Sequence, residues 1–297
     1  MILEGRVAIV TGAGGGLGRA HALYLARQGA RVVVNDLVEE AAERVAAEIA
    51  AEGGEALAIP TSVTDEAGVR AMVAIVTGLW NRVDILVNNA GILRDKTFAK
   101  MSLEDFRQVV EVHLIGAAIC TKAVWDVMRQ QNYGRVVMTT SSSGLYGNFG
   151  QANYGAAKMA LVGLMQTLAL EGEKYNIRVN CLAPTAATQM TEGVLSDASL
   201  EALDPALVSP GLLALVGDEA PTRAILCAGA GHFARAHVTL TEGLHLGAGA
   251  DSGALAIRHW DEISDRNGEI VPDYGFTQAE RELASAGKIV PVAAARR

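Results

Sequence analysis

The stretch that decides the fold is Arg6-Val7-Ala8-Ile9-Val10-Thr11-Gly12-Ala13-Gly14-Gly15-Gly16-Leu17-Gly18. It begins with a short apolar run typical of a buried strand, continues into a glycine-rich turn, and leads into an amphipathic helical pattern over residues 17–28. Glycines at such a turn let the backbone approach a pyrophosphate, and the amides at the helix N-terminus can bind it. The order of strand, glycine turn and helix therefore favours a dinucleotide site over the alternative, a plain flexible turn.

A second apolar run, residues 31–36, ends in Asp36, roughly 20 residues after the glycines. An acid at this place accepts hydrogen bonds from the adenosine ribose hydroxyls and repels a 2′-phosphate. The next residues, Leu37, Val38 and Glu39, include no arginine that would hold such a phosphate. The sequence therefore predicts NAD rather than NADP as the cofactor, and the alternative for Asp36 is a solvated strand end.

Strand and helix patterns alternate along the following chain. Further strands are expected at residues 55–59, 84–87, 135–138, 177–182 and 224–227, and helices at residues 39–52, 65–80, 103–131 and 151–175. Such alternation implies right-handed crossovers and a parallel sheet with helices on both faces, with ligands at the carboxyl ends of the strands. Residues 238–240 favour an additional strand. We expect a dinucleotide-binding domain at residues 1–250 and a carboxyl-terminal extension at residues 251–297.

A serine cluster, Ser141-Ser142-Ser143, follows the fifth apolar run, and Tyr154 and Lys158 come in the next helical pattern. The i,i+4 spacing of Tyr154 and Lys158 places both side chains on one helix face. An ammonium beside a phenol favours the phenolate, and a phenol with a lowered pKa can exchange a proton with an alcohol or carbonyl near neutral pH. A nearby serine hydroxyl can hold the same oxygen. The alternatives are a chance Tyr/Lys pair and a serine cap of a helix.

Three motifs in register resemble those of the short-chain dehydrogenase/reductase family over residues 3–231. They are Thr11-Gly12-x-x-x-Gly16-x-Gly18, Asn88-Asn89-Ala90-Gly91, and Ser141 with Tyr154-x-x-x-Lys158. The resemblance implies an α/β fold with a doubly wound, seven-stranded parallel sheet that binds a nicotinamide dinucleotide. It also implies a homodimer or homotetramer in which the helices at residues 103–131 and 151–175 pair between subunits.

The same resemblance implies roles for single residues. Tyr154 is the expected acid/base, Lys158 the ribose ligand that lowers the pKa of Tyr154, and Ser141 the residue that orients the substrate oxygen, with Ser142 and Ser143 as near alternatives. Replacement of the usual Asn by His113 leaves open whether this histidine takes part in a proton relay or is a hydrogen-bonded core residue. The expected cofactor contacts are Gly12, Gly16, Leu17, Gly18, Asp36, Ser62, Val63, Asn88, Asn89, Ala90, Gly91, Tyr154, Lys158, Pro184 and Thr188.

Four segments show a more specific resemblance within this family: Val34-Asn35-Asp36-Leu37, Gly91-Ile92-Leu93-Arg94-Asp95, Val112-His113-Leu114 and Tyr146-Gly147-Asn148-Phe149-Gly150-Gln151. These segments resemble the dehydrogenase domains of the peroxisomal multifunctional enzyme type 2 family, also called 17β-hydroxysteroid dehydrogenase type 4. The implied reaction is NAD-dependent oxidation of a (3R)-hydroxyacyl-CoA to the 3-ketoacyl-CoA. The alternatives are a dehydrogenase for steroids or other apolar secondary alcohols and, from another class, an NAD-binding scaffold or sensor with little turnover.

The bulk properties limit the remaining classes. A formal net charge of −8 argues against non-specific binding to nucleic acid or to an anionic membrane. The three cysteines, Cys120, Cys181 and Cys227, are widely spaced in apolar surroundings, so neither a disulfide framework nor a metal site is expected. No charged-then-apolar leader precedes the first strand, and no apolar run has the length of a membrane span. We therefore expect a cytoplasmic protein that acts on a small-molecule substrate.

Overall fold

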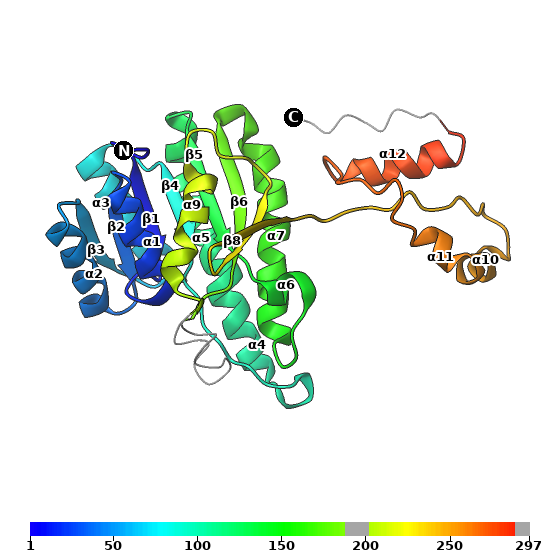
Figure 1. The fold of residues 1–297 in the computed structure, drawn as a ribbon, viewed down its shortest axis with the longest axis horizontal. Coiled ribbons are helices and arrows are strands. Elements are labelled where there is room, and N and C mark those ends of the chain that lie inside the picture. The colour runs from blue at the N-terminus through cyan, green and yellow to red at the C-terminus, as the bar shows by residue number, and fades with distance from the viewer. Residues whose placement is uncertain (188–201, 289–297) are drawn as a thin grey trace. The chain divides into compact units, whose positions relative to one another are not determined.

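An eight-stranded sheet forms the centre of the fold, with the strand order β3-β2-β1-β4-β5-β6-β7-β8 (Figure 1). Its strands are β1 (Val7–Thr11), β2 (Arg31–Asp36), β3 (Ala56–Pro60), β4 (Ile85–Asn88), β5 (Gly134–Thr139), β6 (Ile177–Pro184), β7 (Ile225–Gly229) and β8 (His232–Ala236). All neighbouring pairs from β3 to β7 are parallel. The chain winds outward from β1 to β3 and then from β4 to β7, so the carboxyl ends of β1 and β4 flank the switch point at which ligands bind such sheets.

The computed structural model describes residues 1–187 and 202–288. The chain divides into two compact units, Met1–Arg235 and Ala236–Arg297. The sequence analysis placed this division later, at residue 250. Along the part of the chain that the structure describes, no helix is long and apolar enough to cross a membrane.

The strand β8 adds one strand to the seven expected. It follows β7 after Ala230 and Gly231, whose φ angles of 49° and 73° are those of a two-residue type I′ hairpin turn. This turn reverses the chain, so β8 runs back beside β7 at the edge of the sheet. Within residues 238–240, where an additional strand was favoured, Leu240 forms an isolated antiparallel bridge with Ile270.

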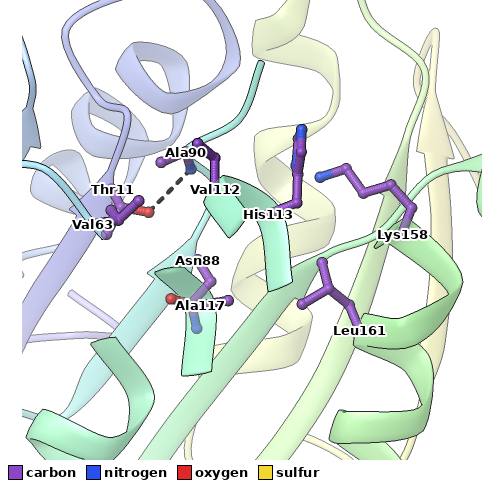
Figure 2. A pocket seen from close by; sticks show the side chains of 9 residues that line it. All are labelled: Thr11, Val63, Asn88, Ala90, Val112, His113, Ala117, Lys158 and Leu161. Atoms are coloured by element: carbon purple, nitrogen blue, oxygen red, sulfur yellow. Dashed lines mark hydrogen bonds between the residues drawn. The ribbon is translucent and has the colours of Figure 1, made fainter. Parts of the chain in front are cut away.

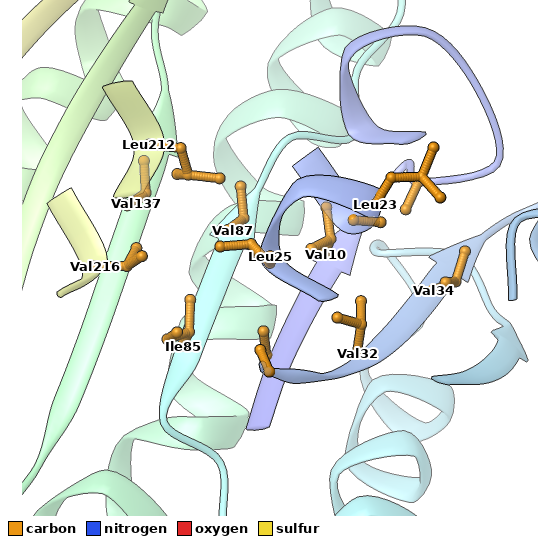
Figure 3. Close-up of a cluster of buried hydrophobic side chains, with 14 of the residues drawn as sticks. Val10, Leu23, Leu25, Val32, Val34, Ile85, Val87, Val137, Leu212 and Val216 are labelled. Atoms are coloured by element: carbon orange, nitrogen blue, oxygen red, sulfur yellow. The ribbon is translucent and has the colours of Figure 1, made fainter. Parts of the chain in front are cut away.

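Helices cover both faces of the sheet. The first face carries α1 (Gly16–Arg27), α2 (Glu39–Ala51) and α9 (Ser209–Val216), and the other carries α3 (Glu66–Trp80), α5 (Gly116–Gln130) and α7 (Ala152–Gly172). Alternate residues of the strands, such as Val10, Val32 and Val87, pack against Leu25 of α1 and Leu212 of α9 (Figure 3). Burial on both faces explains why these strands read as continuous apolar runs.

The helix expected over residues 103–131 is divided into three parts. The chain forms α4 (Leu103–Val110), a π-helical turn (Glu111–Ile115) and α5. His113 lies in the π-helical turn and is buried. A π-helical turn inserts an extra residue into a helix and often marks a functional site. Here it directs His113 against the turn that follows β4.

The second unit contains the short helices α10 (Ser252–Arg258), α11 (Trp260–Ile263) and α12 (Phe276–Ser285). None of its described residues, 236–288, is buried. Apolar side chains such as Ile257 and Trp260 are exposed at 81% and 64%, so the described part of this unit has no core of its own.

Candidate active site

A cavity of about 1040 Å³ opens at the carboxyl edge of the sheet. A volume of this size exceeds that of most drug-sized ligand sites and suits a long ligand such as a dinucleotide together with a substrate. Its walls come from the ends of β1, β2, β4, β5 and β6 and from the beginnings of α1 and α7. The predicted residues that line it are Gly12, Gly16, Leu17, Gly18, Asp36, Ser62, Val63, Asn89, Ala90, Gly91, His113, Ser141, Tyr154, Lys158 and Pro184.

The glycine turn packs closely against the turn after β4. A Cβ atom on Gly12 would lie 2.8 Å from Cα of Ala90, and one on Gly18 would lie 2.1 Å from the carbonyl oxygen of Gly12. Thr11 Oγ1 accepts hydrogen bonds from the backbone amides of Asn89 and Ala90, each at 3.0 Å; Figure 2 marks the second. The two sequence motifs are thus parts of one structure, which any larger residue at these glycines would push apart.

Asp36, at the end of β2, lines the part of the cavity next to the glycine turn. Its Oδ2 accepts from the backbone amide of Gly14 at 2.8 Å, and its Oδ1 accepts from the amide of Val38 at 3.1 Å. Arg44, which the sequence analysis missed, lines the same cavity from α2 and donates to the carbonyl of Gly14 at 3.1 Å. The only sequence signal for Arg44 was a lone arginine on a helix rich in Ala and Glu.

Ser141, Tyr154 and Lys158 meet at one place in the cavity, at the end of β5 and the beginning of α7. Ser141 is hydrogen-bonded to the Tyr154 hydroxyl, and its Oγ also caps the short helix α6 (Ser142–Tyr146) by accepting from the amide of Ser143 at 3.2 Å. Lys158 Nζ lies 5.4 Å from the centre of the Tyr154 ring. Ser141 therefore acts as a helix N-cap, which was the alternative interpretation of the serine cluster, and it contacts Tyr154 at the same time.

The expected lowering of the pKa of Tyr154 by Lys158 does not appear in the structure. Burial raises the pKa of Tyr154, while the hydrogen bond with Ser141 opposes this shift and the charge of Asp95 adds to it. Lys158 is buried and donates to the carbonyl of Thr139 at 2.5 Å. Burial lowers the pKa of Lys158 to about 7, so its ammonium is only partly charged at neutral pH. The lysine is thus directed at the backbone and is a weak source of positive charge here.

His113 packs edge-on against Tyr154, with ring centroids 5.2 Å apart and an interplanar angle of 87°. Its Nε2 lies 2.8 Å from the carbonyl oxygen and 3.1 Å from the amide nitrogen of Ile92, and the tautomer decides which bond forms. Burial first, and the charge of Lys158 second, lower its pKa to about 3, so it is neutral at physiological pH. A Cβ atom on Gly91 would lie 2.2 Å from Cε1 of His113, which explains the glycine at this position.

A second, much smaller cavity shares His113 and Lys158 with the first and lies between the π-helical turn and β4 (Figure 2). Its volume is about 10 Å³, close to the space that one water needs. Asn88, His113 and Lys158 line it, and within the described residues Asn88 Oδ1 and His113 Nδ1 are buried without a hydrogen-bond partner. Asn88 therefore faces this small cavity rather than the large one.

Two of the predicted cofactor contacts, Ser62 and Thr188, need separate comment. Ser62 Oγ lies 2.9 Å from Thr64 Oγ1 and accepts from the amide of Thr64 at 3.2 Å, so this hydroxyl is already engaged at the cavity wall. Thr188 lies outside the described residues. The sequence analysis also did not single out Asp95, Asn148, Phe149 and Gln151 as site residues, although they line the cavity near Tyr154. They come from loops, whose contacts no local periodicity predicts.

Comparison with known proteins agrees with this geometry. The family model described as short chain dehydrogenase matches residues 6–199. A short-chain type dehydrogenase/reductase of Mycobacterium tuberculosis is 46% identical over 276 residues, which are 90% of this chain and 96% of that protein. The peroxisomal multifunctional enzyme type 2 of Mus musculus is 51% identical over 219 residues, which are 71% of this chain but 29% of the mouse enzyme.

Solved structures give the same result. Full-length peroxisomal multifunctional enzyme type 2 from Drosophila melanogaster superposes with a TM-score of 0.81 at 37% identity, covering 96% of this chain and 50% of that one. A 7α-hydroxysteroid dehydrogenase complexed with NADH and 7-oxo glycochenodeoxycholic acid superposes with a TM-score of 0.72 at 31% identity, over 77% of this chain and 94% of the other. The chain is an oxidoreductase that belongs to the short-chain dehydrogenase/reductase family.

Proposed function

We propose that this protein uses NAD to interconvert a secondary alcohol and a ketone, and that its substrate is a (3R)-hydroxyacyl-CoA. The observation that carries the proposal is the meeting of Ser141, Tyr154 and Lys158 in the same cavity as the glycine turn and Asp36. A proton-transferring group and a dinucleotide cradle within one cavity are the two parts that hydride transfer to a nicotinamide requires.

The residues present fit a dinucleotide. The cradle that Gly12 and Gly18 keep open would receive the pyrophosphate at the N-terminus of α1, and Asp36 would accept from the adenosine ribose hydroxyls. Asp36 supports NAD over NADP because its carboxylate would repel a 2′-phosphate. A nicotinamide dinucleotide bound there supplies the acceptor for the hydride.

In the proposed mechanism Tyr154 takes the proton of the alcohol and Ser141 holds the same oxygen by a hydrogen bond. Because burial raises the pKa of Tyr154, its phenolate forms at alkaline pH, and we expect alcohol oxidation to accelerate as the pH rises above neutral. Lys158 would contact the ribose. His113 is neutral, so we assign it a positioning role: it holds the turn at Ile92 and packs against the ring of Tyr154.

The choice of substrate rests on the relatives named multifunctional enzyme type 2 and hydratase-dehydrogenase-epimerase. The exposed cations Arg94, Lys96 and Lys100 flank the cavity loop and are candidates to bind the phosphates of CoA. A steroid or another apolar secondary alcohol is the second candidate, favoured by the hydroxysteroid dehydrogenase structure and by Ile92, Leu93 and Phe149 in the cavity wall.

Assembly and location complete the proposal. We retain the expectation of a homodimer or homotetramer, because Met159 and Leu170 on α7 are exposed at 39% and 44%. Members of this family commonly form oligomers. We also retain a cytoplasmic location, although several relatives are named as peroxisomal proteins. Sedimentation of the purified protein and fractionation of cells test these two points.

The test of the function is the absorbance of reduced cofactor with (3R)-3-hydroxybutyryl-CoA, a steroid alcohol and simple secondary alcohols. Wild-type turnover with the CoA ester supports the proposal, and turnover with none of them refutes it in favour of an NAD-binding scaffold.

Tyr154→Phe should lower kcat about a thousandfold by removing the proton acceptor, yet bind NADH as before. Tyr175→Phe, at the exposed end of the same helical segment, is the matched control. Retained turnover in Tyr154→Phe would remove this residue from the acid/base role.

A further inference from the structure

The loop that carries Asp95 is tied to the beginning of α7 and to the residues that precede it. The backbone amide of Lys96 donates to the carbonyl of Gly150 at 2.9 Å, and Asn153 Nδ2 donates to the carbonyl of Arg94 at 3.1 Å. The side chain of Gln151 adds a direct link, because its Nε2 donates to Asp95 Oδ2 at 2.6 Å. The carboxylate of Asp95 is therefore held at a defined place on the cavity wall.

Gln151 is itself fixed in orientation. Its Oε1 accepts hydrogen bonds from Ser143 Oγ at 2.8 Å and from Asn148 Nδ2 at 3.0 Å. Since both donors approach the oxygen, the amide nitrogen must face Asp95. Gln151 immediately precedes the first residue of α7, one turn before Tyr154. This chain of side chains thus fixes the Asp95 carboxylate in the wall of the cavity that also contains Tyr154.

The charge of Asp95 has no cationic partner within the described residues. Of the two neighbouring cations, Arg94 donates to the carbonyl of Leu93 at 2.8 Å, and Lys96 pairs with Asp105 at 3.0 Å. Lys158 is directed at the backbone carbonyl of Thr139. The charge of Asp95 also raises the pKa of Tyr154, which indicates that its field reaches the reacting oxygen. Asp95 is exposed to solvent, so this field is weakened but not removed.

We propose that Asp95 is a specificity-determining residue that excludes free 3-hydroxy acids and leaves their neutral thioesters as substrates. The proposal rests on the proposed function. In a free 3-hydroxy acid the carboxylate lies two bonds from the carbinol carbon, so binding the hydroxyl at Tyr154 brings a second negative charge into the part of the cavity that Asp95 faces. A thioester has no charge at that position, and the repulsion is absent.

The experiment compares (3R)-3-hydroxybutyrate with its N-acetylcysteamine thioester, each with NAD. This thioester has no phosphates, so the comparison is independent of how the CoA moiety binds. The quantity measured is the ratio of kcat/KM for the thioester to kcat/KM for the acid. We expect Asp95→Asn to narrow the wild-type ratio at least tenfold, chiefly through a gain on the acid, while Asp95→Glu, which keeps the charge, retains the preference.

Two outcomes would overturn the proposal. An unchanged ratio in Asp95→Asn would show that the carboxylate does not select, and a selective loss on the thioester would show that Asp95 binds the substrate instead. NADH binding by each variant confirms that it is folded, and Asp95→Ser is a second charge-free variant if asparagine disturbs the link to Gln151. If the wild type turns over neither the thioester nor the CoA ester, the proposed function fails. If the wild type turns over the thioester but Asp95→Asn leaves the ratio of kcat/KM values unchanged, only the role of Asp95 is refuted and the proposed function stands.

Discussion

At the amino edge of the sheet, buried charges are fully engaged. Asp84, just before β4, has no solvent exposure, and its two oxygens accept from Arg6 and Arg82 and from the amide of Val7. Arg135, at the beginning of β5, uses all three guanidinium nitrogens on the backbone carbonyls of Gly134, Asn176, Gly217 and Asp218. These groups stabilise the ends of strands and leave nothing to bind a ligand.

At the carboxyl edge, buried polar atoms of the described residues lack partners. Asn35 Oδ1, Asn88 Oδ1 and Thr139 Oγ1 lie near the ends of β2, β4 and β5, and His113 Nδ1 belongs to the ring that packs on Gly91. A buried polar atom without a partner costs free energy, so a native protein keeps such atoms chiefly where another molecule or an ordered water can satisfy them. The difference between the edges separates the groups that stabilise the fold from those available for function.

Asp84→Ala removes the buried carboxylate at the amino edge of the sheet and should give the largest effect on stability. It leaves Arg82 and the backbone amide of Val7 without their acceptor, while Arg6 keeps only its pairing with Asp218. We expect the free energy of unfolding in denaturant to fall by about 3 kcal/mol. NADH affinity of the folded protein should stay within about twofold of wild type. Asp126→Ala removes a carboxylate that is 65% exposed and paired with Arg129, and this control should cost less than about 0.5 kcal/mol. A similar small loss in Asp84→Ala would contradict the assigned role.

Gly91→Ala tests the other edge. Its new Cβ would lie 2.2 Å from His113, which cannot move without losing its contact with Ile92. We expect about 2 kcal/mol of destabilisation from overpacking and a loss of turnover of at least tenfold, because the His113 ring contacts Tyr154. Gly163→Ala, on α7 with no heavy atom within 4 Å of the added Cβ, should be neutral or slightly stabilising. Equal effects of the two substitutions would show that the contact with His113 is unimportant.

Asp36→Ser should give the smallest effect and concerns cofactor choice. Removing the carboxylate ends the repulsion of a 2′-phosphate, while Arg44 remains in the same cavity to attract one. We expect the ratio of kcat/KM for NADP to that for NAD to rise about tenfold, which corresponds to about 1.4 kcal/mol. Adding Arg44→Gln should remove most of this gain. An unchanged ratio in Asp36→Ser would mean that Asp36 does not determine the choice between NAD and NADP.

The sequence predicted those parts of the molecule that depend on local pattern. The strand before Gly12, the position of Asp36 after β2, and the i,i+4 pair of Tyr154 and Lys158 all follow from short-range spacing. The link between Asp95 and Gln151 was not predicted, since it joins a carboxylate and a side-chain amide that lie far apart in the chain. The direction of the pKa shift of Tyr154 was wrong for a related reason, because burial is a property of the packed structure and not of the spacing.

The second unit marks a further limit. Residues 236–288 include no buried side chain, so no core fixes the short helices of this unit. The apolar residues Phe276, Ala279 and Leu283 of α12 do recur at helical spacing, but the sequence analysis assigned no helix there. The π-helical turn at Glu111–Ile115 was missed because its residues fit an uninterrupted helix equally well. The extra strand β8, in contrast, had a local signal in the Ala230-Gly231 turn, and that signal was not used.

The most direct measurement is a titration of the wild-type protein with NADH, followed by the fluorescence of the bound cofactor. If the carboxyl edge is a dinucleotide site, binding is saturable at one NADH per chain, NAD competes with it, and NADPH binds more weakly because of Asp36. Absence of saturable binding to any nicotinamide nucleotide would contradict the assignment of this edge, and with it the proposed role of Tyr154.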